Sequence, residues 1–243
     1  MPTIDEIRAT AERDLAVVLA DLDGRRRRLL LAAVAQYGSV DDIPDSVWAE
    51  IVEDGERRIV VALLAIALAA DRWTSDEISR QGVAMDDLPA DRLAQYAVAA
   101  ARQAATYSQQ AADAIRAKLQ RRAEEIKLDS ATGLGEATAD ELSAAIEDTI
   151  DGDNEAAAVT EATVAITTGQ RGAADRSPTV VDMVWMTERD SRVYPRSPVC
   201  PRCLPLHGQS QDVWAKVFPD GPGYAVHPRC RCWLRPIVAK EVA

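Results

Sequence analysis

All four cysteines of this 243-residue chain lie in its last 44 residues. Cys200 and Cys203 form the motif "CPRC", and Cys230 and Cys232 end the motif "HPRCRC", which begins at His227. A C-x2-C pair flanked by prolines suits a tight turn that points two thiolates at one ion. Cys230 and Cys232 would face the same side of an extended strand. The spacing therefore predicts that two distant segments are joined through these side chains.

Zinc is the metal that this donor set favours. Zinc takes four tetrahedral ligands, with sulfur at about 2.3 Å, and a structural site leaves no open position. Five donors compete for four places, so either the four thiolates bind and His227 supports them, or His227 replaces one cysteine. We favour the four-cysteine set. The other interpretations are small core cysteines, or disulfides formed in an oxidising medium. His207 is expected near the site or at the surface, not as a ligand.

The N-terminal part of the chain is acidic and helical in composition. Residues 1–170 carry 17 Lys and Arg against 32 Asp and Glu, whereas residues 171–243 carry 11 against 7. Ala, Leu, Arg, Glu and Gln dominate the first part, and Gly and Pro fall mostly at breaks such as Gly38 and Pro44. We expect helices over residues 3–35, 45–72, 75–81, 90–128, 139–150 and 154–169.

The long helix expected over residues 90–128 carries a stripe of mostly small residues at alternating spacings of four and three. Such a stripe is typical of close helix packing. It favours a long intramolecular helical hairpin, with a self-association seam as the alternative. The members of the stripe are Leu93, Ala97, Ala100, Ala104, Tyr107, Ala111 and Ala114.

The C-terminal part has the composition of strands and turns instead of long helices. The segment "TVVDMVWMT", residues 179–187, is rich in β-branched and aromatic side chains, which predicts a strand buried on both faces. The segment "CRCWLRPIV" predicts a closing strand. The fold class is therefore α+β, with a mostly helical N-terminal region at 1–130, a connector at 128–140, and a small zinc-stapled α+β domain at 138–243. A domain with so slight a core often needs such a staple.

Several function classes are disfavoured by the same residues. The longest apolar run, residues 59–70, is shorter than the roughly 18 to 20 residues that span a bilayer. The N-terminus shows no secretion signal, so we expect synthesis in a reducing cytoplasm. Zinc deaminases carry an H-x-E motif upstream of their cysteine pair, and here no histidine precedes Cys200. We expect a protein that is not an enzyme.

One longer pattern resembles a known family. The string "VWMTERDSRVYPRSPVCPRCLPLHGQ", followed by a variable loop and "HPRCRCWLRP", is similar to the C-terminal domain of MuF-like phage minor head (head morphogenesis) proteins. The helix before it resembles the family's helix with a Thr-Glu pair. The segment "YPRSP" looks like an insertion, and the first 130 residues match only in being helical. The matching positions are Thr160, Glu161, Trp185, Thr187, Asp190, Cys200, Cys203, Gly208, His227, Pro228, Cys230, Arg231 and Cys232.

The resemblance implies a virion structural protein inside the phage head. Its partners would be the portal protein and the major capsid protein, and its role would lie in head assembly, DNA packaging or DNA delivery. The mildly basic C-terminal part would be the region to approach packaged DNA, through Arg229, Arg231 and Arg235, and a homo-oligomer is an option. The alternative is a zinc-stapled nucleic-acid-binding module that uses this part or the run Arg25–Arg28.

Overall fold

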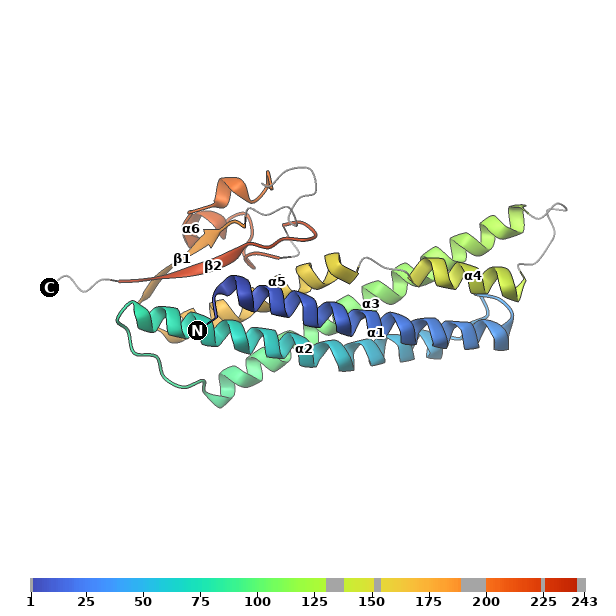
Figure 1. Cartoon of the computed structure of the whole chain (residues 1–243), viewed down its shortest axis with the longest axis horizontal. Coiled ribbons are helices and arrows are strands. Elements are labelled where there is room, and N and C mark those ends of the chain that lie inside the picture. The colour runs from blue at the N-terminus through green and yellow to red at the C-terminus, as the bar shows by residue number, and fades with distance from the viewer. Residues whose placement is uncertain (1, 130–137, 151–153, 189–199, 224–225, 240–243) are drawn as a thin grey trace. The chain divides into compact units, whose positions relative to one another are not determined.

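The computed structural model describes residues 2–129, 138–150, 154–188, 200–223 and 226–239. Helices dominate these residues and a two-stranded sheet lies near the C-terminus (Figure 1). The fold class is as predicted: a helical N-terminal bundle precedes a small C-terminal region with an antiparallel sheet and a cysteine cluster. The elements are α1 (Ile4–Tyr37), α2 (Asp45–Arg80), α3 (Ala90–Asp129), α4 (Ala139–Ile150), α5 (Asn154–Arg176), β1 (Val180–Met186), η1 (Leu204–Leu206), α6 (Gln211–Trp214) and β2 (Trp233–Val238).

The chain forms two compact units, and neither is continuous in sequence. The first contains Met1–Ala16, Val61–Ala100 and Glu155–Ala243, and the second contains Val17–Val60 and Ala101–Asn154. The boundaries fall within α1, α2 and α3 and at the start of α5. Most of the predicted connector at 128–140 lies outside the described residues, and the predicted division into 1–130 and 138–243 stays a prediction. The units themselves do not follow that division.

Local signals explain where the helices begin and end. Thr3 accepts a hydrogen bond from the amide of Glu6 through its hydroxyl, at 3.2 Å, and the Glu6 carboxylate accepts one from the amide of Thr3 at 2.7 Å. This capping box satisfies two amides that the first helical turn leaves unpaired. At the other end of α1, Gly38 adopts a φ of 79° and its amide donates to the carbonyl of Val34. Glycine ends a helix in this way because it lacks a Cβ.

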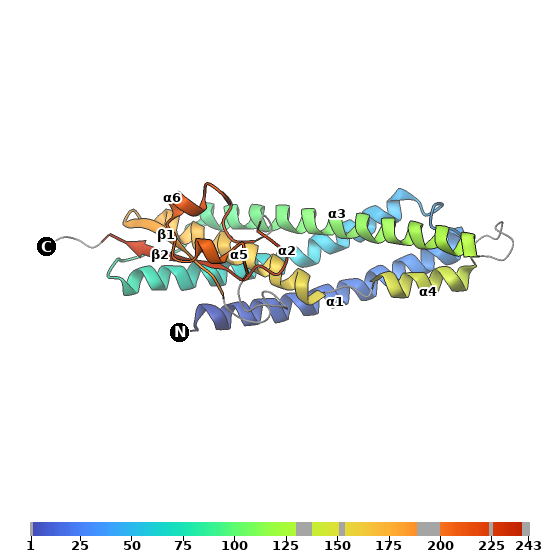
Figure 2. The same cartoon turned by 90° about the horizontal axis from the view of Figure 1, so that it is seen from above.

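The core of the second unit is built from all four of its helical segments. The α1–α2 turn, the end of α3 and α4 lie together in both views (Figure 1 and Figure 2). Apolar side chains from each segment fill the space between them, as the helical periodicity requires. The buried members are Leu30, Ala33, Val34, Val40, Ile43, Trp48, Ile51, Ala112, Ile115, Leu119, Ala123, Leu142, Ala145, Ile146 and Ile150.

The buried face of α3 is rotated from the predicted stripe. Ala100 and Ala104 are buried as expected, but Leu93 and Ala114 are exposed. The buried face runs mostly at steps of four, and small residues alone did not reveal it because α3 contains alanine on every side. Its members are Tyr96, Ala100, Ala104, Ser108, Ala112, Ile115, Leu119 and Ala123.

Two helices are longer than the sequence predicted. The separate helix expected at 75–81 is the end of α2, which runs unbroken to Arg80. The helix expected to end at residue 169 continues to Arg176. A buried carboxylate explains the extension of α5, because Asp71 of α2 accepts hydrogen bonds from both Arg176 and Tyr96. Burial, and then the hydrogen bond to Asp71, raises the pKa of Tyr96.

The sheet is small and covered along its edges. β1 and β2 pair antiparallel, with Trp185 opposite Leu234. The prediction that β1 is buried on both faces is wrong: Met183 and Trp185 are buried, whereas Asp182, Val184 and Met186, which alternate with them, are only partly buried. A two-stranded sheet offers cover on one face only, so its strand alternates.

Glutamine side chains take the place of a third strand beside β2. The amide of Val238 donates to Gln81 and the Gln81 side chain donates to the carbonyl of Pro236, both at 3.1 Å. Gln170 accepts from the amide of Leu234 at 3.0 Å. Unpaired strand edges invite pairing with other chains. These contacts remove that hazard and fix β2 against α2 and α5.

The close approach of α5 to α2 yields the first prediction. A Cβ at Gly169 would lie 2.1 Å from the carbonyl oxygen of Ala67, which is backbone and cannot turn away. We expect Gly169→Ala to lower the free energy of unfolding by about 1–3 kcal/mol through overpacking. Gly24→Ala is the matched control, because its Cβ meets only the end of the Arg28 side chain. That control should gain about 0.5–1 kcal/mol. Urea unfolding measures both, and equal effects would contradict the packing argument.

Candidate metal centre

The first cysteine pair lies in a tight turn that leads into η1. The amide of Leu204 donates to the carbonyl of Cys200 at 2.9 Å, and the amide of Leu206 donates to that of Cys203 at 3.0 Å. This local turn brings the two side chains to one side, as the C-x2-C spacing predicted. We call residues 200–209 the first arm.

The first arm is fixed to β1 by four hydrogen bonds. Trp185 donates its amide to Gln209 at 3.0 Å and accepts from the amide of Gly208 at 2.8 Å. The Thr187 hydroxyl donates to the carbonyl of Cys203, and the Thr187 amide donates to Nδ1 of His207. Gly208 has a positive φ of 78°, a conformation that glycine adopts readily at a chain reversal. Thr187 and Trp185 therefore hold the first arm in register with the sheet.

The second arm, residues 226–232, lies against α5. The amide of Arg229 donates to the hydroxyl of Thr160 at 2.9 Å, and the hydroxyl of Thr163 donates to the carbonyl of Cys230. Arg229 has a φ of 61°, a left-handed conformation that a non-glycine residue adopts rarely. The hydrogen bond to Thr160 holds this turn in place. Cys230 and Cys232 precede β2, so the prediction that they stand on a strand is wrong.

The same face of α5 carries two further contacts to the C-terminal segment. Thr167 donates to the carbonyl of Pro222 at 3.1 Å, and Gln170 accepts from Leu234. Thr160, Thr163, Thr167 and Gln170, which we call the α5 polar stripe, follow helical spacing. Among them our sequence analysis singled out only Thr160. A sequence signal for the other three was present: polar residues recur at steps of three and four in a helix that is otherwise rich in Ala and Val.

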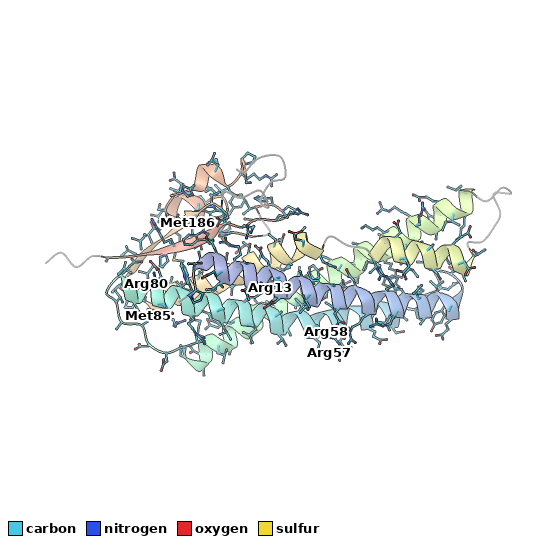
Figure 3. The ribbon with its side chains drawn as sticks, viewed as in Figure 1. Arg13, Arg57, Arg58, Arg80, Met85 and Met186 are labelled. Atoms are coloured by element: carbon cyan, nitrogen blue, oxygen red, sulfur yellow. The ribbon has the colours of Figure 1, made fainter. Side chains whose placement is uncertain are left out.

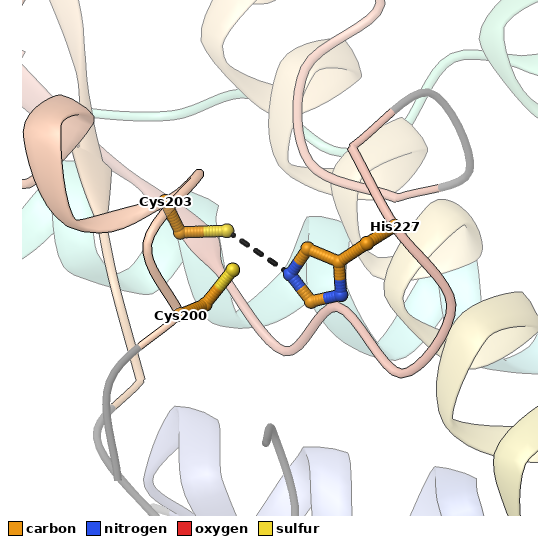
Figure 4. Close-up of side chains that lie close together, drawn as sticks. All are labelled: Cys200, Cys203 and His227. Atoms are coloured by element: carbon orange, nitrogen blue, oxygen red, sulfur yellow. Dashed lines mark hydrogen bonds between the residues drawn. The ribbon is translucent and has the colours of Figure 1, made fainter. Parts of the chain in front are cut away.

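The two arms bring all five predicted donors together. One group contains Cys200, Cys203 and His227, and another contains Cys203, Cys230 and Cys232; within each group the donor atoms lie within 4.8 Å of one another. In Figure 4 the sulfurs of Cys200 and Cys203 point toward the His227 ring. Cys203 belongs to both groups and joins them.

His227 presents its Nε2 to the cluster. Its Nδ1 lies 2.6 Å from the carbonyl oxygen of Pro228, a position that calls for a proton on Nδ1. Nε2 lies 3.2 Å from the sulfur of Cys203 (Figure 4). With Nδ1 protonated, Nε2 keeps its lone pair and can accept from the thiol or bind a metal. A carbonyl partner on the other ring nitrogen is the usual arrangement of a metal-binding histidine.

The donor set fits a tetrahedral ion. Four ligands at metal–sulfur distances of about 2.3 Å stand about 3.8 Å apart, which is within the spread of each group. The exposed fractions of the four cysteines are between 0% and 2%. No disulfide joins them. The cluster could therefore hold a metal ion, and solvent would have little access to it.

A small aromatic core surrounds the cluster. Trp185 and Trp214 are both fully buried, with ring centroids 5.9 Å apart, and Phe218 packs 6.0 Å from Trp185. Trp214 also donates its indole N–H to the carbonyl of Met183 at 2.6 Å. Trp185 lies within this core. The four cysteines belong to the same apolar cluster, so the arms and the aromatic core are packed as one body.

The thiols cannot all ionise by themselves. Hydrogen bonds to Cys230 and Cys232, together with burial, raise the pKa of Cys203. Hydrogen bonds from Cys203 and Cys232 lower the pKa of Cys230, so one thiolate is held by its two neighbours. The pKa of Cys232 is raised: the hydrogen bond to Cys203 lowers it, but the hydrogen bond to Cys230 and burial outweigh that effect. Only a cation would stabilise three thiolates so close together.

The remaining predicted residues fall in three places. His207 lies outside both donor groups, as expected, and bonds to Thr187. Asp190, one of the positions that match the family pattern, lies outside the described residues. Arg231 was expected to approach phosphate, and that expectation is wrong: it is buried and forms an ion pair with Glu12 of α1 at 2.7 Å. The sequence could not show a partner 219 residues away.

The chain matches no protein-family model, no curated protein and no solved structure. The likeness to minor head proteins therefore rests on the residues quoted above. Among the described residues, no helix combines the length and apolar character that a membrane span needs.

The raised pKa values predict a pH dependence of metal binding. Cys203 and Cys232 hold protons at neutral pH, and both must lose them to bind an ion. Affinity should fall by at least about a hundredfold for each pH unit lowered from about 7.5 to about 6. Competition with a chelator measures the slope, and calorimetry in two buffers counts the released protons independently. A slope near zero would contradict the assignment.

Proposed function

We propose that the cluster is a structural zinc site that staples the two arms to one another. The observation that carries this proposal is a set of four buried thiols and one partly buried imidazole, drawn from two segments. They form two groups that share Cys203, and within each group the donor atoms lie within 4.8 Å of one another. Sulfur donors in tetrahedral geometry favour zinc over harder cations. Cytoplasmic thiols are kept reduced, which favours a metal over disulfides.

A structural site is a better account than a catalytic one. A catalytic zinc keeps a position open to water or substrate, and these donors are buried and outnumber the four places that zinc offers. The aromatic core and the α5 polar stripe close the cluster on the protein side. The proposal is therefore that the protein acts by holding partners and has no hydrolytic activity of its own.

We further propose that the protein is a phage minor capsid protein of the MuF-like head morphogenesis type. The support is the combination W-x-T, C-x2-C, Gly and H-P-x-C-R-C, most of whose members pack in the small core or belong to the cysteine–histidine cluster. In this proposal it lies inside the head, associates with the portal and the major capsid protein, and aids head assembly, DNA packaging or delivery.

The nucleic-acid-binding alternative has weaker support. Three of the four arginines in the run Arg25–Arg28 form ion pairs with carboxylates of the chain: Arg25 with Asp21, Arg26 with Asp23 and Arg27 with Glu147. Side chains engaged in this way are poor phosphate contacts. Arg235 is exposed and remains a candidate.

The zinc proposal predicts about one zinc per chain. Cys203→Ser should remove it, because Cys203 belongs to both donor groups, and should shift the fluorescence of Trp185 and Trp214 as their core loosens. His207→Gln is the matched control and should keep its zinc. Elemental analysis under reducing conditions and tryptophan emission measure both. Correct folding of the wild-type protein without metal would refute the staple.

The head-protein proposal predicts co-purification with portal and capsid shell. Phage carrying Cys203→Ser should yield heads that lack the protein, with assembly or infectivity impaired. Heads from the His207→Gln phage control for the effect of substitution. Absence of the protein from both procapsid and mature particle, or its presence only on the outer surface, would contradict this role. A steeply salt-dependent affinity for duplex DNA would favour the alternative instead.

A further inference from the structure

The first turns of α1 carry two charged side chains that reach the metal centre. Arg8 and Glu12 lie one helical turn apart. Glu12 accepts two parallel hydrogen bonds from Arg231, at 2.7 Å to Nε and 3.2 Å to Nη2. Arg8 donates from Nη1 to Glu188 at 2.7 Å. All four residues belong to the first unit.

Each ion pair ends beside one arm of the centre. Arg231 stands between the two donors Cys230 and Cys232. Glu188 follows Thr187, whose hydroxyl donates to the carbonyl of Cys203 at 2.9 Å. The α1 helix is therefore tied to the second arm directly and to the first arm through Thr187.

The Glu12–Arg231 pair is buried, whereas the Arg8–Glu188 pair is partly buried, with Glu188 24% exposed; Arg8 also pairs with Asp5 of its own helix at 3.1 Å. The exposed fractions of the Arg231 and Glu12 side chains are 6% and 7%, and that of Arg8 is 1%. Nε and Nη2 of Arg8 have no hydrogen-bond partner among the described residues. A buried pair stabilises only when both charges are in position, and a buried charge that loses its partner is strongly destabilising. Displacing the second arm would therefore leave Glu12 without its partner and weaken the docking of α1.

The order of charges also fixes the register of α1. The helix offers a positive and then a negative side chain, whereas Glu188 and Arg231 offer the opposite signs. A slip of one turn would bring Arg8 toward Arg231, and like charges would oppose the misplaced contact.

We propose that Arg8 and Glu12 are positioning residues for the metal centre, and that the bound metal in turn holds residues 4–16 of α1 in place. This inference rests on the proposed zinc site. Binding equilibria of this kind are reciprocal: if docked α1 strengthens metal binding by some factor, bound metal strengthens the docking of α1 by the same factor. A passive surface ion pair would show no such equality.

The first experiment measures the affinity of the protein for zinc. Glu12→Gln removes the charge but keeps the shape and an oxygen that can still accept a hydrogen bond from Arg231. Zinc affinity should fall by about 10–100-fold, the usual effect of changing a residue that orients a ligand. Asp14→Asn is the matched control: it removes one carboxylate from the same helix, where Arg13 and Asp14 pair on the surface at 68% and 67% exposure (Figure 3 labels Arg13).

The second experiment measures the effect of bound metal on the docking of α1. Hydrogen exchange of the amides of residues 4–16 should accelerate on chelation of the wild-type protein, and should accelerate less in Glu12→Gln, where the docking of α1 and metal binding are already partly uncoupled. Residues 20–35 of α1 should not change. Cobalt-substituted protein supplies a spectroscopic check, because the ligand-field bands of the bound ion should shift in Glu12→Gln and not in Asp14→Asn. The charge-swapped pair Glu12→Arg with Arg231→Glu should recover affinity to within about tenfold of the wild type.

The outcomes separate the two proposals. Wild-type protein with one zinc per chain, equal affinities in Glu12→Gln and Asp14→Asn, and chelation-insensitive exchange at residues 4–16 would overturn the inference and leave the zinc site standing. Wild-type protein that folds and binds no zinc would overturn both. Reduced affinity with matching loss of protection supports the coupling.

Discussion

Side chains of one helix satisfy the backbone of the irregular segments on which the cysteine cluster is built. Thr160, Thr163, Thr167 and Gln170 of α5 bond to backbone groups of residues 222–234. Buried amide and carbonyl groups that lack a sheet ladder or a helix must find such partners. The cluster therefore depends on α5 as much as on the cysteines. Without the α5 side chains, the backbone groups of the second arm would be buried without hydrogen-bond partners.

The sheet and the cysteine cluster are stabilised as one body. A two-stranded sheet is marginal alone, and this one gains its core from Trp185, Trp214 and the buried thiols. Those thiols cannot ionise together without a cation, so the cluster could hold several thiolates only around a bound ion. The small size of the apolar core explains why a metal would contribute to stability here and would be superfluous in a larger domain.

Buried charges determine which segments meet in the first unit. Asp71 receives Arg176 and Tyr96, which holds the end of α5 against α2 and α3. Glu12 receives Arg231, which joins α1 to the second arm. Burying such a pair costs desolvation free energy. The pair favours one arrangement of the helices, since only one register satisfies both charges. Gly169 adds to this, because helices that touch at backbone distance have no freedom to slide.

The sequence by itself determined the helical N-terminal region, the existence of both strands and the identity of the five candidate metal donors. These follow from local spacing: apolar periodicity, a capping box such as Thr3–Glu6, and a C-x2-C pair are encoded within a few neighbouring residues. Only the tertiary structure decided that α5 runs to Arg176, that Cys230 precedes its strand, that β1 is covered on one face, and that Arg231 faces Glu12. Each of these depends on a partner far away in the chain, and the free energy of burying a charge or an edge is set by that partner, which no local pattern specifies.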